Sequence, residues 1–76
     1  MKTVQISLNS IDKVKSFVND ITKFDYDFDL VSGRYVIDAK SIMGIFSLDL
    51  SKPIELHAHT DNAKEFLNAI GKFIVK

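Results

Sequence analysis

The sequence predicts an α+β domain: a four-stranded antiparallel sheet that carries two long helices and one short helix on one face. Four segments alternate polar and apolar residues with the two-residue period of a half-buried strand. Two others repeat apolar residues every three or four positions, as an amphipathic helix does. These elements close one core only if both helices cover the same sheet face, so we expect an open-faced β-sandwich.

The N-terminal part of the chain predicts a strand followed by a helix. Residues 3–8 alternate with the strand period. A helix follows over residues 10–23, and both Asn9 and Ser10 are residue types that cap helices. Its apolar stripe consists of Ile11, Val14, Phe17, Val18 and Ile21.

The middle of the chain predicts a β-hairpin. Its arms are residues 25–31 and 34–39, and Ser32-Gly33 supplies the turn. The first arm is expected to turn its apolar residues inward, namely Tyr26, Phe28 and Leu30. It turns its acidic residues outward, namely Asp25, Asp27 and Asp29. In the second arm one face is shared by Tyr35, Ile37 and Ala39.

The C-terminal part predicts one short helix, a strand and a long helix. Ser41 opens an apolar segment that ends at Phe46 and is long enough for one or two turns. The strand over residues 54–59 has a polar outer side with Glu55, His57 and His59. Thr60-Asp61-Asn62 is expected to cap the last helix. The stripe of that helix is Ala63, Phe66, Leu67, Ile70 and Phe73 or Ile74.

The composition excludes several classes of protein. We expect one domain over residues 1–76, because a chain of 76 residues has room for a single core. The absence of cysteine excludes disulfides and thiolate metal sites. Ten basic and ten acidic residues balance, which argues against nucleic acid as a partner. No signal-type or membrane-spanning apolar run is present, so we expect a cytoplasmic protein that does not enter the membrane.

Metal binding and catalysis are both disfavoured by the sequence. His57 and His59 share a strand face, and nearby aspartates are suitable metal ligands, but an ordinary solvated sheet face explains the same residues. Single, scattered glycines form no phosphate loop, and no serine or carboxylate has an evident catalytic partner. We therefore expect no metal, no cofactor and no enzymatic activity.

The segment that begins at Ser41 is the one functional signal. Its hydroxyl lies at the start of a helical turn beside Lys40, and Met43 and Phe46 follow at a spacing that presents both on one side. A phosphoryl group on Ser41 would meet backbone N–H groups there. The alternative is that Ser41 is only a helix cap and that the apolar residues after it fill the core, namely Ile42, Met43, Ile45 and Phe46.

This segment resembles the regulatory serine motif of HPr, the histidine-containing phosphocarrier of the bacterial sugar phosphotransferase system. The similar run is Ala39-Lys40-Ser41-Ile42-Met43-Gly44-Ile45-Phe46-Ser47-Leu48. The similarity extends upstream to residue 23 and downstream through the last helix, about two-thirds of the chain. It implies an HPr-like open-faced sandwich, in which Ser41 matches the serine that a dedicated kinase phosphorylates in some bacteria. The modified family protein acts there as a corepressor in carbon catabolite control.

The resemblance also implies a partner-binding surface. It consists of Lys40, Ile42, Met43 and Phe46, beside the regulatory serine. In the family this surface contacts the serine kinase, enzyme I and a transcriptional regulator. Methionine suits such adaptable contacts, so an exposed apolar patch is expected here.

The resemblance fails at the phosphocarrier site. The family begins its first helix with His-Ala-Arg-Pro, whereas this chain reads Leu8-Asn9-Ser10-Ile11-Asp12-Lys13. Ser10 stands near the place of the phosphoryl-accepting histidine, and Asp12 stands where the arginine would neutralise the phosphoryl group. His57 and His59 are too distant in the sequence to match it. Asp49 and Pro53 also depart from flexible family positions, which indicates a reshaped connection into the last strand.

Three hypotheses follow from this sequence. The first is an HPr-like regulatory or adaptor protein that is phosphorylated on Ser41 and does not transfer a phosphoryl group through histidine. The second is a phosphocarrier that accepts the phosphoryl group from enzyme I at Ser10 or a displaced histidine. The third is a binding module outside the phosphotransferase system that shares only the fold, which burial of Met43 and Phe46 would favour.

Overall fold

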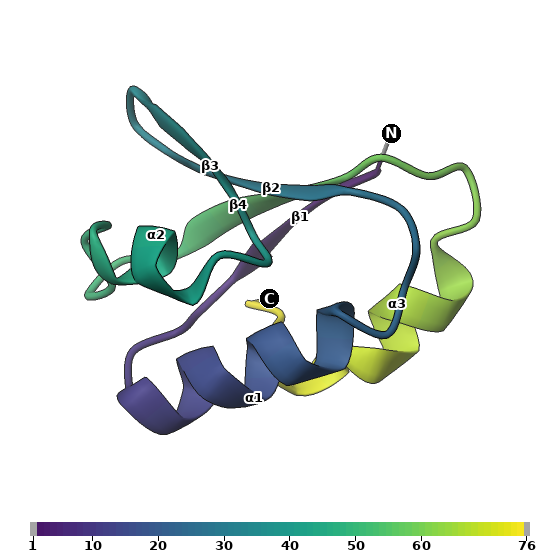
Figure 1. Ribbon diagram of the computed structural model, residues 1–76, viewed down its shortest axis with the longest axis horizontal. Coiled ribbons are helices and arrows are strands. Elements are labelled where there is room, and N and C mark those ends of the chain that lie inside the picture. Colours follow the sequence, from purple (N-terminus) through teal and green to yellow (C-terminus); the bar gives the residue numbers. More distant parts are fainter. Residues whose placement is uncertain (1, 76) are drawn as a thin grey trace.

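The computed structural model describes residues 2–75 and confirms the open-faced sandwich (Figure 1). One sheet lies above, and all helices lie below it. The elements in chain order are β1 (Lys2–Ile6), α1 (Ile11–Ile21), β2 (Phe28–Ser32), β3 (Tyr35–Asp38), α2 (Ile42–Phe46), β4 (Ile54–Ala58), α3 (Lys64–Ala69) and a 3₁₀ turn (Gly71–Phe73).

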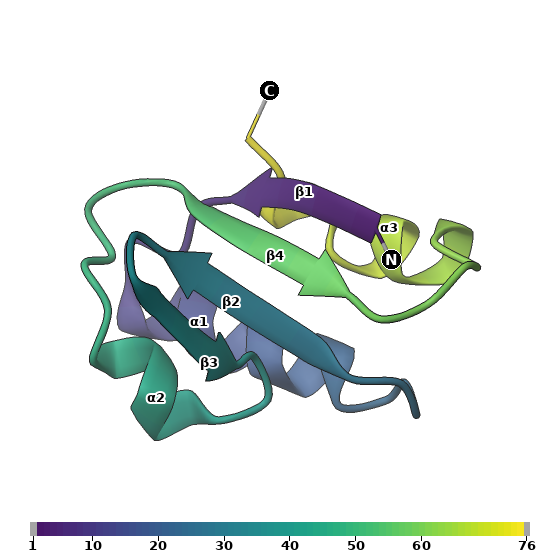
Figure 2. The same cartoon turned by 90° about the horizontal axis from the view of Figure 1, so that it is seen from above.

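The sheet has the strand order β1-β4-β2-β3, and every neighbouring pair is antiparallel (Figure 2). One register row crosses all four strands through Val4, Leu56, Leu30 and Ile37. Leu56 and Leu30 are fully buried, and Val4 and Ile37 pack against the core from the outer strands. The row therefore marks the sheet face that the helices cover.

The core forms where α1 and α3 meet the underside of the sheet. From α1 it takes the fully buried Val14, Phe17 and Ile21. Phe17 meets Phe73 edge to face, with the ring centroids 5.7 Å apart, and Phe66 meets Phe28 in the same way at 5.5 Å. Among residues 2–75 no buried residue is polar or charged, so the core of this cysteine-free domain is entirely apolar.

The predicted first arm of the hairpin begins too early. The strand was expected from residue 25, but β2 begins at Phe28, so Asp25 and Asp27 precede the strand. Tyr26 instead stacks on Phe24, with the ring centroids 5.6 Å apart. The physical reason is that a lysine side chain, not a neighbouring strand, binds the backbone carbonyls of Phe24 and Tyr26.

The prediction for the last helix was also wrong in part. The residue at the N-cap is Ala63, whose methyl side chain cannot accept a capping bond. The Thr60 hydroxyl accepts the N–H of Asn62, which precedes the helix. The helix was expected to run on toward Ile74, but α3 ends at Ala69 and a 3₁₀ turn follows. A glycine at position 71 weakens a helix there.

The remaining boundaries differ from the predictions by a few residues. Strand β1 ends at Ile6 although Leu8 is also fully buried, and α1 ends at Ile21, two residues before the expected end. Of the two cap candidates, Ser10 occupies the N-cap of α1. Within residues 2–75, none of the helices has the length and apolar character needed to cross a bilayer.

Candidate functional site

Ser41 is both a helix cap and a surface residue. It has an extended backbone, with φ −93° and ψ 102°, and its Oγ accepts a hydrogen bond from Gly44 N at 3.3 Å. The Ser41 carbonyl accepts the first helical bond, from Ile45 N at 3.1 Å. The residue as a whole is exposed, so Ser41 lies at the surface of the molecule.

The apolar side chains after Ser41 divide into two groups. Ile45 is fully buried and Ile42 is half-buried, so these two anchor α2 to the core. Met43 is 77% exposed and Phe46 is 40% exposed. The alternative in which all four fill the core is therefore wrong for Met43 and Phe46. We call the exposed group of Ser41, Met43 and Phe46 the α2 surface.

Lys40 has a structural contact that the sequence did not indicate. Its Nζ donates to the Phe24 carbonyl at 2.7 Å and to the Tyr26 carbonyl at 3.0 Å. The same ammonium group lies 5.7 Å from the centroid of the Phe28 ring. Lys40 thus fastens the segment before β2 to the turn that carries Ser41, and its role in partner binding remains a prediction.

The beginning of α1 is the second predicted site. Ser10 is exposed at the N-cap, and its Oγ accepts a hydrogen bond from Lys13 N at 3.2 Å. Asp12 is the acidic residue in the first turn. Beside it is a hollow of about 240 Å³, lined by Asp12, Lys13, Ser16, Lys72 and Phe73. Lys72 Nζ donates to Ser16 Oγ there at 3.2 Å, so the Lys72 ammonium group already contacts a neutral hydroxyl group.

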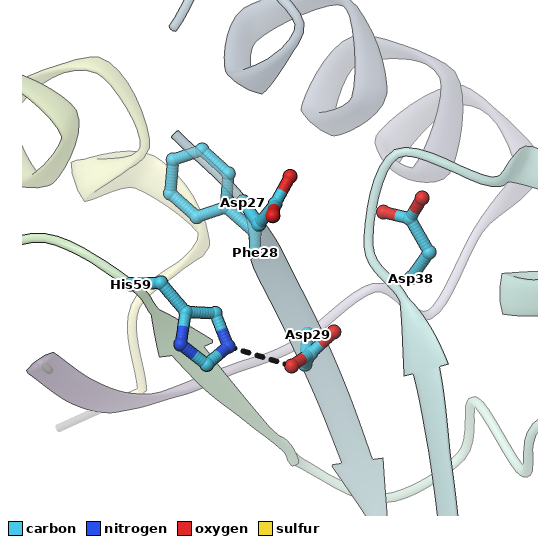
Figure 3. A pocket seen from close by; sticks show the side chains of 5 residues that line it. All are labelled: Asp27, Phe28, Asp29, Asp38 and His59. Carbon is cyan, nitrogen blue, oxygen red and sulfur yellow. Dashed lines mark hydrogen bonds and ion pairs between the residues drawn. The ribbon is translucent and has the colours of Figure 1, made fainter. Parts of the chain in front are cut away.

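The outer sheet face brings the histidines next to acidic residues. β4 and β2 are neighbours, and His59 Nε2 lies 2.7 Å from Asp29 Oδ2 (Figure 3). His57 Nε2 lies 2.8 Å from Glu55 Oε1 on its own strand. A hollow of about 440 Å³ opens beside His59, lined by Asp27, Phe28, Asp29, Asp38 and His59. Within residues 2–75, however, no three His, Asp or Glu side chains are grouped to hold a metal ion.

Tyr26 is another residue whose environment the sequence did not reveal. Its hydroxyl is buried and has no hydrogen-bond partner among the described residues. Burial raises the pKa of the Tyr26 phenol, and the nearby Glu65 carboxylate raises it further. The phenol therefore stays neutral, and Tyr26 contributes to the aromatic cluster with Phe24, Phe28 and Phe66.

Solved structures with this fold define the class of protein. HPr from Thermoanaerobacter tengcongensis matches with a TM-score of 0.78 and 29% identity, over 95% of this chain and 89% of that one. The phosphocarrier protein HPr from Bacillus anthracis matches with a TM-score of 0.71 and 28% identity, over 97% and 94%. Crh from Bacillus subtilis, described as an intertwined dimer with a swapped domain, matches at 0.65 and 23% identity, over 96% and 90%. The class is thus that of the small phosphocarrier proteins.

The family follows from the sequence comparison. The family model described as "PTS HPr component phosphorylation site" matches residues 13–76. The chain therefore belongs to the HPr family of the phosphotransferase system. No curated protein sequence matches it. The matched residues include Ser41 and begin after Ser10 and Asp12, where this chain departs from the family motif.

Proposed function

We propose that this protein is a regulatory or adaptor member of the HPr family that is phosphorylated on Ser41 and does not transfer a phosphoryl group through histidine. The observation that carries the proposal is that Ser41 is an exposed residue beside the exposed side chains of Met43 and Phe46. A regulatory role of this kind accounts both for the exposed α2 surface and for the missing histidine.

The α2 surface supports phosphorylation coupled to partner binding. A kinase would transfer the γ-phosphoryl group of ATP to Ser41 Oγ, leaving ADP and a serine phosphate ester. The new dianion would stand beside two exposed apolar side chains, Met43 and Phe46, whose burial by a partner is favourable. We expect that partner to be an HPr-type serine kinase, a transcriptional regulator or another component of the phosphotransferase system.

The beginning of α1 supports the loss of the carrier reaction. A phosphocarrier must release its phosphoryl group to the next protein, and a serine ester at Ser10 is a poorer donor than a phosphohistidine. The Asp12 carboxylate in the same first turn would repel the phosphoryl group that a cation should neutralise. His57 lies in β4 and His59 follows its end, and their rings contact Glu55 and Asp29 respectively.

The same proposal places the protein in the cytoplasm as a non-enzymatic module without cofactor. Its specificity would lie in protein contacts, because the hollows among the described residues are shallow surface features next to charged side chains. Unmodified protein should have no activity of its own on ATP or phosphoenolpyruvate.

The test is phosphorylation by two different donors, read by intact mass and by mapping of the modified residue. One reaction contains a bacterial HPr serine kinase with ATP, and the other contains enzyme I with phosphoenolpyruvate. We expect one added phosphate on Ser41 in the first reaction and none in the second. Ser41→Ala should abolish the modification, whereas Ser10→Ala, a matched helix cap, should leave it unchanged.

Other outcomes would select another function. Acid-labile, base-stable phosphate after incubation with enzyme I would contradict the proposal and support a carrier that uses a displaced histidine. An acid-stable phosphate from enzyme I on Ser10 would support the unusual serine carrier. If neither reaction modifies the chain, the proposal fails, and a binding module that shares the HPr fold is the remaining explanation.

A further inference from the structure

The two edges of the sheet differ in whether they are covered. At the β1 edge, Val75 N donates to Gln5 O at 2.8 Å, and Ser7 N donates to Phe73 O at 2.8 Å. An antiparallel bridge between Ile6 and Ile74 lies between these bonds. At the other edge, β3 pairs only with β2 among residues 2–75. Strand β3 is therefore the open edge.

The hairpin turn determines which backbone groups of β3 are free. Ser32 and Tyr35 face each other across a two-residue loop in which Gly33 has φ 59°. Such a loop is closed by a hydrogen-bonded pair, and hydrogen-bonded and non-hydrogen-bonded pairs then alternate along the ladder. Ala39 N donates to Phe28 O at 2.9 Å, as this alternation requires. The N–H groups of Val36 and Asp38 consequently point away from β2.

The β3 strand and the turn before it leave apolar area exposed and two charged side chains without an ion pair. Tyr35 is 68% exposed and Val36 is 64% exposed. Asp38 lies directly opposite Asp29 in the register, and Asp29 already contacts His59, whose Nε2 lies 2.7 Å from Asp29 Oδ2. Within residues 2–75 neither Asp38 nor Arg34 forms an ion pair with a side chain of opposite charge. A cation placed beside Asp38 would give its carboxylate an ion-pair partner.

We propose that the β3 edge binds the β3 edge of a second copy, antiparallel and about a two-fold axis at Val36. In that register Val36 faces Val36, and the two residues exchange the backbone hydrogen bonds that β2 leaves free. Arg34 of each copy faces Asp38 of the other, and Tyr35 faces Ile37. The segment Arg34-Tyr35-Val36-Ile37-Asp38 is thus complementary to itself in charge and in apolar character.

The shape of the molecule leaves space beside the β3 edge near the tip of the hairpin. The short length of β3 limits the affinity of a contact there. The tip of the β2–β3 hairpin rises away from the helices (Figure 1), and α2 lies on the outer side of β3 nearer its other end (Figure 2). Strand β3 has four residues, so the contact is far smaller than a standard stable interface. We expect a reversible dimer with a dissociation constant in the range of about 0.1 to 1 mM. The dimer does not depend on phosphorylation of Ser41, so either proposal can fail alone.

The test is sedimentation velocity of the unphosphorylated protein from about 10 µM to about 1 mM. We expect the weight-average sedimentation coefficient to rise with concentration. Arg34→Asp and Asp38→Arg each place like charges opposite each other in a homodimer, so each should weaken association about tenfold. An equimolar mixture of the two variants restores opposite charges at both contacts, and it should associate at least as well as the original protein.

Two further measurements keep the test decisive. Lys52→Glu is the control: like Arg34→Asp it replaces a positive by a negative side chain, but at a position away from β3. It should leave association unchanged. Amide exchange should slow at Val36 with rising concentration but not at Ile37, which β2 already pairs with Leu30. The amide-exchange measurement uses the original protein. It therefore remains valid even if Asp38→Arg unfolds the turn in which Asp38 Oδ1 accepts a hydrogen bond from Lys40 N. A protein that stays monomeric to about 1 mM, or a mixture no better than its components, overturns the proposal.

Discussion

Ser10 and Ser41 cap their helices in almost the same way, yet their surroundings differ. Each Oγ accepts a hydrogen bond from the N–H three residues later, at 3.2 Å for Ser10 and 3.3 Å for Ser41. An acidic residue follows Ser10 in the first turn, whereas the first turn after Ser41 has none. Met43 stands exposed in that turn, and the turn before it is fastened by Lys40. A capping serine therefore does not by itself indicate a modification site.

The comparison separates what the fold needs from what a partner could use. The α1 cap stabilises a helix that contributes three buried residues to the core. The α2 cap stabilises a five-residue helix with one buried residue, so the same bond supports far less packing. Its methionine is 77% exposed and contributes little to the core.

The largest expected difference between the two sites is in the unfolding free energy lost when the lysine beside each serine is replaced. Lys40→Met should lower the free energy of unfolding by about 2 kcal/mol, because the partly buried carbonyls of Phe24 and Tyr26 lose a charged donor. Lys13→Met is the matched control and should change it by less than about 0.5 kcal/mol, since the Lys13 side chain is exposed. Urea denaturation of both variants measures the difference. Equal losses would show that the Lys40 contact does not stabilise the fold.

A smaller difference is expected between the two serines. Ser10→Ala should cost about 1 kcal/mol of unfolding free energy, because it removes the cap of the helix that carries Phe17. Ser41→Ala should cost about 0.5 kcal/mol, since α2 has little packing to lose. Thermal and urea unfolding of the two variants, side by side, test this order. A larger loss at Ser41 would show that its main role is structural.

The smallest expected effect is a change in the pKa of Asp49, in the turn after α2. The hydroxyl and then the backbone N–H of Ser51 hydrogen-bond to Asp49 and lower the pKa of its carboxyl group. A lowered pKa in the folded state means that the ionised carboxylate adds stability above the unfolded-state pKa. That contribution is lost as the pH falls through the folded-state pKa. Ser51→Ala should raise the pKa of Asp49 toward its ordinary value, which an NMR titration of the side chain measures; Ser47→Ala is the control.

The sequence was sufficient for the fold because the apolar periods were clear. Strand β4 alternates perfectly between buried and half-buried residues, and α1 buries Val14, Phe17 and Ile21 as its stripe predicts. The boundaries of β2 could not be predicted in this way. Tyr26 continues the alternation, but Lys40, fourteen residues further along, binds its carbonyl. Long-range side-chain contacts of this kind leave no periodic signal.

The candidate site was predictable only in part. The spacing of Met43 and Phe46 correctly indicated one exposed side of α2, whereas Ile42 has the same apolar character and is half-buried. Which of several apolar residues faces solvent depends on how a short helix is turned against the sheet. Ile37 contributes to that orientation, since its Cδ1 would lie only 3.3 Å from a side chain at Gly44.

The strand order also constrains how the protein is made. β1 pairs with β4 and not with β2 or β3, so the first strand of a growing chain has no strand partner until residues 54–58 have left the ribosome. The β2–β3 hairpin, by contrast, is complete as soon as its two arms have emerged. Translation therefore produces the β2–β3 hairpin before β4, and the four-stranded sheet can close only after β4 has emerged.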